Sequence, residues 1–188
     1  RVDRRQRQMC IRDRVSPNLY GIFFEDINHA ADGGLYAELI SNRSFEDSDN
    51  AIPTWRTSAS NGAIITSQLV SKALLNNAQG KALQITVKAD KVATASLINE
   101  GFWGINAVQG RTYKLSLFAK GNYKGGLKAR LISADGRTVY AETTVDAAIG
   151  KKWNKYTAEL TANANDPKAQ FEFCLLYTSP SPRDQRGS

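Results

Sequence analysis

Short strand-like runs dominate residues 51–173. Apolar and polar side chains alternate there, most clearly where Tyr113, Leu115 and Leu117 are interleaved with lysine and serine. This period of two predicts sheets with one buried face and one face in solvent. Runs of this kind lie between Gly, Asn and Asp turns and cover residues 63–70, 82–89, 103–108, 112–120, 127–134, 138–145, 155–162 and 169–173. We therefore expect an antiparallel β-sandwich, a jelly roll, of about 120 residues, enough for its own core.

Residues 15–50 have a different pattern. The apolar run Leu19–Phe24 is typical of a strand buried on both faces, as in a parallel sheet. After a polar loop, residues 35–46 place apolar side chains four positions apart, which predicts an amphipathic helix. Strand, loop and helix form one βα unit, which cannot close a sheet alone.

The formal net charge of +7 is concentrated at the two ends, because residues 1–14 carry +4 and residues 174–188 carry +1. The nearly neutral middle offers no electrostatic footprint for nucleic acid. No apolar run approaches the roughly 18 residues of a membrane span. We therefore expect neither a nucleic-acid nor a membrane partner.

Both ends lack the apolar periodicity of their neighbours and resemble peptides translated from sequencing-adapter DNA. We interpret residues 1–14 and 174–188 as non-native tails, with a natural basic arm as the alternative. Cys10 and Cys174 fall in or at these tails, so the cysteines indicate no redox compartment. The location stays open, with a secreted or periplasmic protein among the possibilities.

Residues 16–46 carry the most specific pattern, the run GIFFEDINHAADGGLYAE closed by NRSFE. This stretch closely resembles the opening of α-L-arabinofuranosidases of glycoside hydrolase family 51. The following region resembles the carbohydrate-binding-like insert of the longer family members, in NEGFWGI and GRTYKLSLFAKG. Together the resemblance spans nearly all of residues 15–173.

The resemblance implies a mainly β fold, in which a galactose-binding-like sandwich over residues 51–173 follows one βα unit of a truncated (β/α)8 barrel over residues 15–50. It implies a retaining glycosidase that removes terminal non-reducing α-L-arabinofuranosyl residues from arabinose-containing polysaccharides without a cofactor. The family's two catalytic glutamates come from later barrel strands. We therefore expect this chain to have no catalytic residue and no activity alone.

Glu25 is the one substrate-binding residue that the resemblance assigns. It lies at the C-terminal end of the expected barrel strand, and the family's glutamate at this motif position binds a hydroxyl of arabinofuranose. A carboxylate accepts two or more such hydrogen bonds; the alternative is a cap of the following loop. His29 is the only histidine, so no histidine-based metal cluster is expected. Asn99-Glu100 matches the family's acid/base dipeptide, but it lies in the β-rich region and is interpreted as coincidental.

Several aromatic side chains of the β-rich region are candidates for stacking on sugars, namely Phe102, Trp103, Tyr123, Tyr140, Trp153 and Tyr156. Large aromatics in a sandwich more often belong to the core, and Trp103 and Trp153 adjoin alternating strands. We therefore favour a core position for both. Two other functions remain open, a stand-alone carbohydrate-binding module without catalysis and a structural domain without a ligand.

Overall fold

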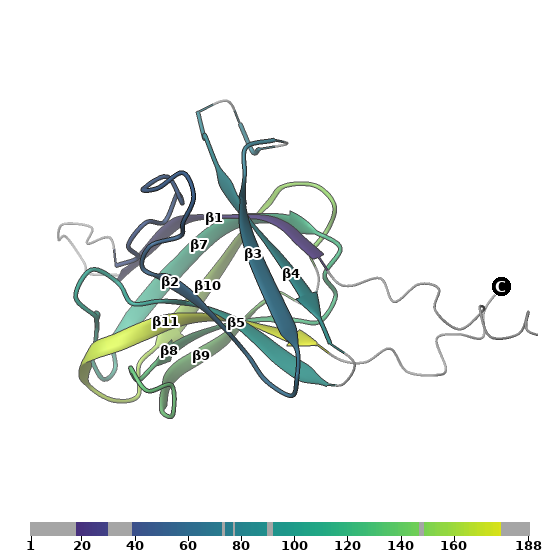
Figure 1. Cartoon of the computed structure of the whole chain (residues 1–188). Helices are drawn as coiled ribbons and strands as arrows, with labels where there is room; N and C mark the ends of the chain where they lie inside the picture. Colours follow the sequence, from purple (N-terminus) through teal and green to yellow (C-terminus); the bar gives the residue numbers. More distant parts are fainter. Residues whose placement is uncertain are drawn as a thin grey trace, which may run out of the picture.

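Two antiparallel sheets face each other in the computed structural model (Figure 1). The structure describes the backbone of residues 18–29 and, with side chains, residues 39–72, 74–76, 78–89, 92–145 and 149–177. Sheet A has the order β10-β7-β1-β4-β3, and sheet B has the order β2-β5-β11-β8-β9 with β6 paired to β11. The bounds are β1 Asn18–His29, β2 Trp55–Ala59, β3 Ile64–Val70, β4 Ala82–Lys88, β5 Ala93–Asn99, β6 Ile105–Ala107, β7 Thr112–Gly121, β8 Leu127–Ile132, β9 Val139–Asp146, β10 Asn154–Thr161 and β11 Asp166–Tyr177.

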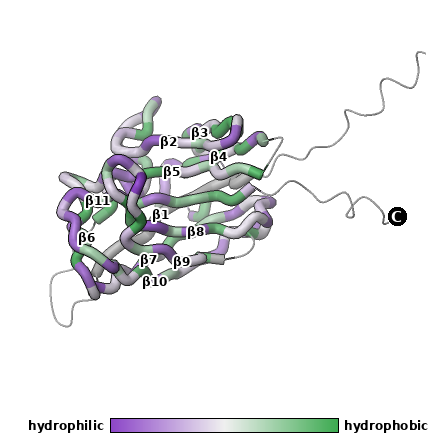
Figure 2. Tube along the Cα trace, turned by 90° about the horizontal axis from the view of Figure 1, so that it is seen from below, coloured by the Kyte–Doolittle hydropathy of each residue, from purple (hydrophilic) through white to green (hydrophobic). Residues whose placement is uncertain are grey.

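The alternation seen in the sequence is confirmed by the burial of the strands. In β7 every second side chain from Tyr113 to Ala119 is buried, and in β8 the buried side chains are Leu127, Ala129 and Leu131. Figure 2 shows apolar and polar positions interleaved along the strands. The inner faces of the two sheets therefore form one core, to which Phe171 and Phe173 of β11 contribute large rings. The antiparallel sandwich expected from the pattern is confirmed.

The first strand does not have the partners that the sequence analysis expects. β1 lies between β7 and β4 in sheet A, and both neighbours run antiparallel to it. Its expected place in a parallel sheet is therefore wrong in this structure. The register slips near the start of the strand, between Leu19 and Ile22 opposite β4, and again in its middle, between Phe24 and Asp26 opposite β7. An apolar run shows that a strand is buried, but it does not specify the direction of its neighbours.

The expected helix over residues 35–46 is wrong for its described part. Residues 39–46 form bends and turns, and residues 35–38 lie outside the described residues. Ile40 and Phe45 enter the core of the sandwich, where Phe45 packs against Trp55 with ring centroids 5.4 Å apart. Asn42 and Phe45 both have positive φ, of 50° and 60°, which ends any helical course.

β11 extends beyond the boundary that the sequence analysis places at residue 173. Residues 174–177, which that analysis assigns to the C-terminal tail, pair with β5, and Cys174 and Leu175 are buried. The remaining tail residues, 1–14 and 178–188, lie outside the described part of the chain.

Candidate functional site

A buried asparagine at the end of β5 holds the chain in place. Asn99 is 0% exposed, and its Oδ1 accepts hydrogen bonds from the backbone N–H groups of Ser41 (3.2 Å) and Gly101 (2.8 Å). Its Nδ2 donates to the carbonyl oxygen of Ser41 at 2.9 Å. One side chain thus joins the segment between β1 and β2 to the turn that follows β5, which makes Asn99 a structural residue.

The turn that follows presents two large aromatic side chains to solvent. Residues 100–104 are closed by a hydrogen bond from the Gly104 N–H to the Glu100 carbonyl at 3.1 Å. Phe102 is 59% exposed and Trp103 is 86% exposed. The core position favoured for Trp103 is therefore wrong. We call residues 100–104 the aromatic turn.

The aromatic turn has a defined conformation. Gly101 and Gly104 have φ of +67° and +96°, a region that favours glycine. A Cβ at Gly104 would lie 2.8 Å from the Cα of Lys168, so the turn packs directly on β11. The Lys168 Nζ also donates to the Trp103 carbonyl at 2.9 Å. The exposed rings are therefore carried by a backbone that is fixed from both sides.

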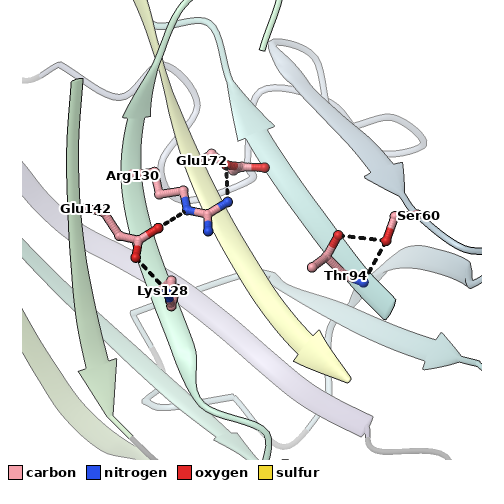
Figure 3. A network of polar contacts seen from close by, with 6 residues as sticks. All are labelled: Ser60, Thr94, Lys128, Arg130, Glu142 and Glu172. Atoms are coloured by element: carbon pink, nitrogen blue, oxygen red, sulfur yellow. Dashed lines mark hydrogen bonds and ion pairs between the residues drawn. The ribbon is translucent and has the colours of Figure 1, made fainter. Parts of the chain in front are cut away.

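Charged side chains cross the outer face of sheet B (Figure 3). Arg130 of β8 bonds Glu142 of β9 at 2.6 Å and Glu172 of β11 at 3.4 Å, and Lys128 also donates to Glu142. We call Lys128, Arg130, Glu142 and Glu172 the charged ladder. The hydrogen bond from Lys128 and the neighbouring Arg130 hold the pKa of Glu142 below its ordinary value. The two acids are thus compensated by cations, and the ladder carries no net charge.

Short side chains of β5 and β11 lie beside this ladder and are shielded from solvent. Cys174 and Ser96 occupy paired positions on the outer face, and both are buried although they point away from the core. Burial raises the pKa of the Cys174 thiol above its ordinary value. This thiol is therefore protonated at neutral pH and unsuited to act as a nucleophile.

A further charged pair links the aromatic turn to sheet B. The Nε of Arg56 in β2 lies 3.9 Å from Oε1 of Glu100, and both side chains are partly exposed. Arg56 also donates from its Nη2 to Oε1 of Gln170 at 2.7 Å. The guanidinium is thus oriented by Gln170 and only loosely paired with Glu100.

The outer face of sheet A carries a second set of aromatic side chains, each with a lysine over its ring. The Lys120 Nζ lies 5.0 Å from the ring centroid of Trp153, and the Lys155 Nζ lies 5.8 Å from that of Phe118. Ammonium groups at these distances form cation–π contacts with the ring face. Trp153 is half-buried, so its expected core position is also wrong.

The other sequence-predicted residues have varied surroundings. Tyr123 and Tyr156 are buried, Tyr140 is partly buried against the core, and the Tyr123 hydroxyl donates to the carbonyl of Leu176 at 2.7 Å. The backbone of Glu25, the expected substrate-binding residue, lies in β1 at the register slip opposite Leu117 and Ser116 of β7. The structure brings Glu25 into sheet A, whereas the aromatic turn adjoins sheet B.

The described residues contain no group of three or more His, Cys, Asp and Glu side chains that could hold a metal ion. Within the same residues, no helix is long and apolar enough to cross a membrane.

Comparison with known proteins assigns this β-sandwich to a family. Residues 37–181 match the family described as "Carbohydrate binding domain". The chain belongs to this family. The match includes both sheets except β1, together with the aromatic turn and the charged ladder.

The relatives of this chain include longer proteins that are named as arabinofuranosidases. The chain is 34% identical over 168 residues to alpha-L-arabinofuranosidase 1 of Arabidopsis thaliana, an alignment that covers 84% of this chain and 24% of that protein. An arabinose-bound MgGH51 α-L-arabinofuranosidase structure matches 86% of this chain and 27% of its own, with 32% identity and a TM-score of 0.65. A carbohydrate-binding module of the β-sandwich superfamily matches 73% of this chain and 55% of its own, with 18% identity and a TM-score of 0.51, and shows the fold alone. The chain thus spans about a quarter of the length of its arabinofuranosidase relatives.

Proposed function

We propose that this chain is the part of an α-L-arabinofuranosidase that bears its carbohydrate-binding sandwich, and that the sandwich binds arabinose-containing polysaccharides or oligosaccharides. The observation that carries the proposal is the match to the arabinose-bound arabinofuranosidase over 86% of the chain, at 32% identity. The Arabidopsis alignment, at 168 residues, is also longer than the segment 37–181. This extra length favours a region of the enzyme over a stand-alone module.

We expect the chain alone to have no hydrolase activity. A retaining glycosidase needs two carboxyl groups roughly 5 Å apart, one of which has a raised pKa and acts as the general acid. The described carboxyl groups with a shifted pKa are all lowered, each with a hydrogen-bonding side chain as the largest cause, and they are Asp49, Asp135 and Glu142. Glu100, which follows Asn99 as in the family's acid/base dipeptide, lies on an exposed turn beside Arg56. The surroundings of these carboxyl groups therefore support the proposal of an inactive chain.

For the complete enzyme we propose that Glu25 binds a hydroxyl of the terminal arabinofuranose. Replacing Glu25 with Gln in that enzyme would weaken a charge-assisted hydrogen bond, so kcat/KM should fall by about ten- to hundredfold. The melting temperature should change little. A Glu25→Gln enzyme that loses its fold, while its folded fraction keeps full activity, would instead make Glu25 a structural cap.

Two measurements on the purified 188-residue chain test the proposal. Calorimetric titration and affinity electrophoresis with α-1,5-arabinan and with arabinoxylan should reveal binding. Incubation with an aryl α-L-arabinofuranoside should release no aglycone above the buffer rate. Absence of binding to both polysaccharides would refute the binding role, and turnover that Glu100→Gln abolishes would refute the expected inactivity.

A further inference from the structure

The aromatic turn exposes two large aromatic side chains for which the fold itself gives no reason. Aromatic side chains of a sandwich usually contribute to its core, yet Trp103 is 86% exposed and Phe102 is 59% exposed. Asn99, Gly101 and Gly104 hold the backbone below them. A fixed turn that holds two large apolar side chains in solvent exposes apolar area without any gain to the fold, which indicates a binding role.

We propose that Trp103, together with Glu100 and Arg56, forms a binding site for a neutral sugar ring of a polysaccharide. The site lies where β2 begins and β5 ends in sheet B. The inference rests on the proposed carbohydrate-binding function and assigns it to one surface. Trp103 supplies the apolar platform for the C–H face of the sugar, since an exposed indole gains by covering its ring. Phe102 is a second exposed ring on the same turn.

Glu100 and Arg56 supply the polar part of the site. A carboxylate accepts hydrogen bonds and a guanidinium donates them, so the pair matches the mixed donors and acceptors of neighbouring sugar hydroxyls. Their closest atoms are 3.9 Å apart, which leaves both groups with capacity for further hydrogen bonds. Glu100 would repel the carboxylate of an acidic sugar, whereas Arg56 is already held by Gln170 and Lys168 by the Trp103 carbonyl, so the site favours a neutral sugar.

The fixed backbone of the turn lowers the entropic cost of binding. The Lys168 Nζ holds the Trp103 carbonyl, and the Gly104 N–H closes the turn on Glu100. The platform is thus formed before the sugar arrives, and preorganisation of this kind raises affinity.

The aromatic side chains of sheet A are less suited to the same role. Lys120 covers the ring of Trp153, and Lys155 covers that of Phe118. The partly positive C–H groups of a sugar would compete with an ammonium group for the same negative ring face. Trp153 therefore provides a matched control, a second tryptophan in another part of the fold.

The test measures binding of α-1,5-arabinan to four forms of the full chain, namely the wild type, Trp103→Ala, Trp103→Phe and Trp153→Ala. Trp103→Ala should weaken binding by about tenfold or more, and Trp103→Phe should restore part of it because it keeps an aromatic face. Trp153→Ala should bind within about twofold of the wild type, since no sugar contact is assigned to it. Melting temperatures check the fold, and the exposed Trp103 should be replaceable without a drop. Polygalacturonate, an acidic polysaccharide, should bind more weakly than arabinan.

Three results would overturn the inference. If Trp103→Ala binds arabinan as tightly as the wild type while the wild type clearly binds, the sugar site lies elsewhere and the proposed function stands. Loss of binding in Trp153→Ala alone would place that site on sheet A. A wild-type chain that binds neither arabinan nor arabinoxylan would refute the proposed binding function, and this inference with it.

Discussion

Replacing Asn99 with Ala should destabilise the sandwich, although Asn99 contributes no large apolar surface. The substitution removes the acceptor for the N–H groups of Ser41 and Gly101, both of which are buried. The carbonyl of Ser41 loses one donor but keeps the hydroxyl of Thr54, which lies 3.2 Å away. Two buried donors without partners cost about 1–3 kcal/mol each, so the free energy of unfolding should fall by about 2–6 kcal/mol.

Thermal and urea unfolding, followed by circular dichroism, measure this loss. In a domain of this size, 1 kcal/mol corresponds to about 2–4 °C, so the melting temperature of Asn99→Ala should fall by about 4–24 °C. Asn99→Asp is a second test with nearly the same shape. It keeps an acceptor for the two N–H groups but turns a carboxylate oxygen toward the Ser41 carbonyl. Burial beside the Ser41 carbonyl oxygen should raise the pKa of the new carboxyl group. The stability of Asn99→Asp should therefore increase relative to the wild type as the pH falls and this group becomes protonated.

Glu100→Gln is the matched control, because it changes the neighbouring residue and the other half of the dipeptide. Its side chain is exposed and its contact with Arg56 is 3.9 Å long, so the change should stay within about 0.5 kcal/mol. The reasoning fails if Asn99→Ala costs less than about 1 kcal/mol, or if Glu100→Gln costs as much as Asn99→Ala.

Four further substitutions have defined outcomes. Gly104→Ala should lower the free energy of unfolding by about 1–3 kcal/mol, because the added Cβ would lie 2.8 Å from the backbone of β11. Gly136 has φ +72° but no atom near the added Cβ, so Gly136→Ala should cost about 1 kcal/mol. Urea unfolding compares the two variants. Glu142→Gln should lower stability at neutral pH by less than about 1 kcal/mol. The hydrogen bond from Lys128 is the largest cause of the lowered pKa of Glu142, so the Glu142 carboxylate stabilises the fold fully above the ordinary carboxyl pKa. The stability difference between the wild type and Glu142→Gln should therefore vanish as the pH falls through the lowered pKa, which a series of thermal melts at different pH measures. Ile22→Pro, in the middle of sheet A between β4 and β7, should cost about 3 kcal/mol or more, seen as a large drop in melting temperature.

The strands that the sequence predicted best are those with one face in solvent. β7 and β8 alternate because their outward positions carry Lys114, Lys128 and Arg130, and the pattern locates both strands within a few residues. β5 was missed because it is a central strand that is shielded on both faces. Its outward Ser96 and Ile98 are buried beside the ladder, so no polar alternation marks the strand.

Residues 35–46 show where local periodicity was overridden by tertiary contacts. The four-residue spacing is real, but Ile40 and Phe45 are drawn into the core of the sandwich. The Trp55 Nε1 donates to the Asn42 carbonyl at 3.0 Å, and Asn99 holds Ser41. These partners lie 13 and 58 residues away along the chain, so no local pattern could have indicated them.

The aromatic turn illustrates what a pattern of alternation cannot detect. The run over residues 103–108 predicts a strand that starts at Trp103, and a residue in such a strand would be expected in the core. β6 starts two residues later, at Ile105, because Gly101 and Gly104 adopt positive φ and take the intervening rings out of the extended course. The sequence contains a local signal for this turn, two glycines three positions apart around a Phe-Trp pair. Glycines at such spacing favour a tight turn, and large apolar side chains on a tight turn reach the core only if the turn folds inward. Here Lys168 and the backbone of β11 lie under the turn, and the rings point to solvent. The exposure of Trp103 is therefore a consequence of the glycine geometry, and its use in binding is what the tryptophan variants measure.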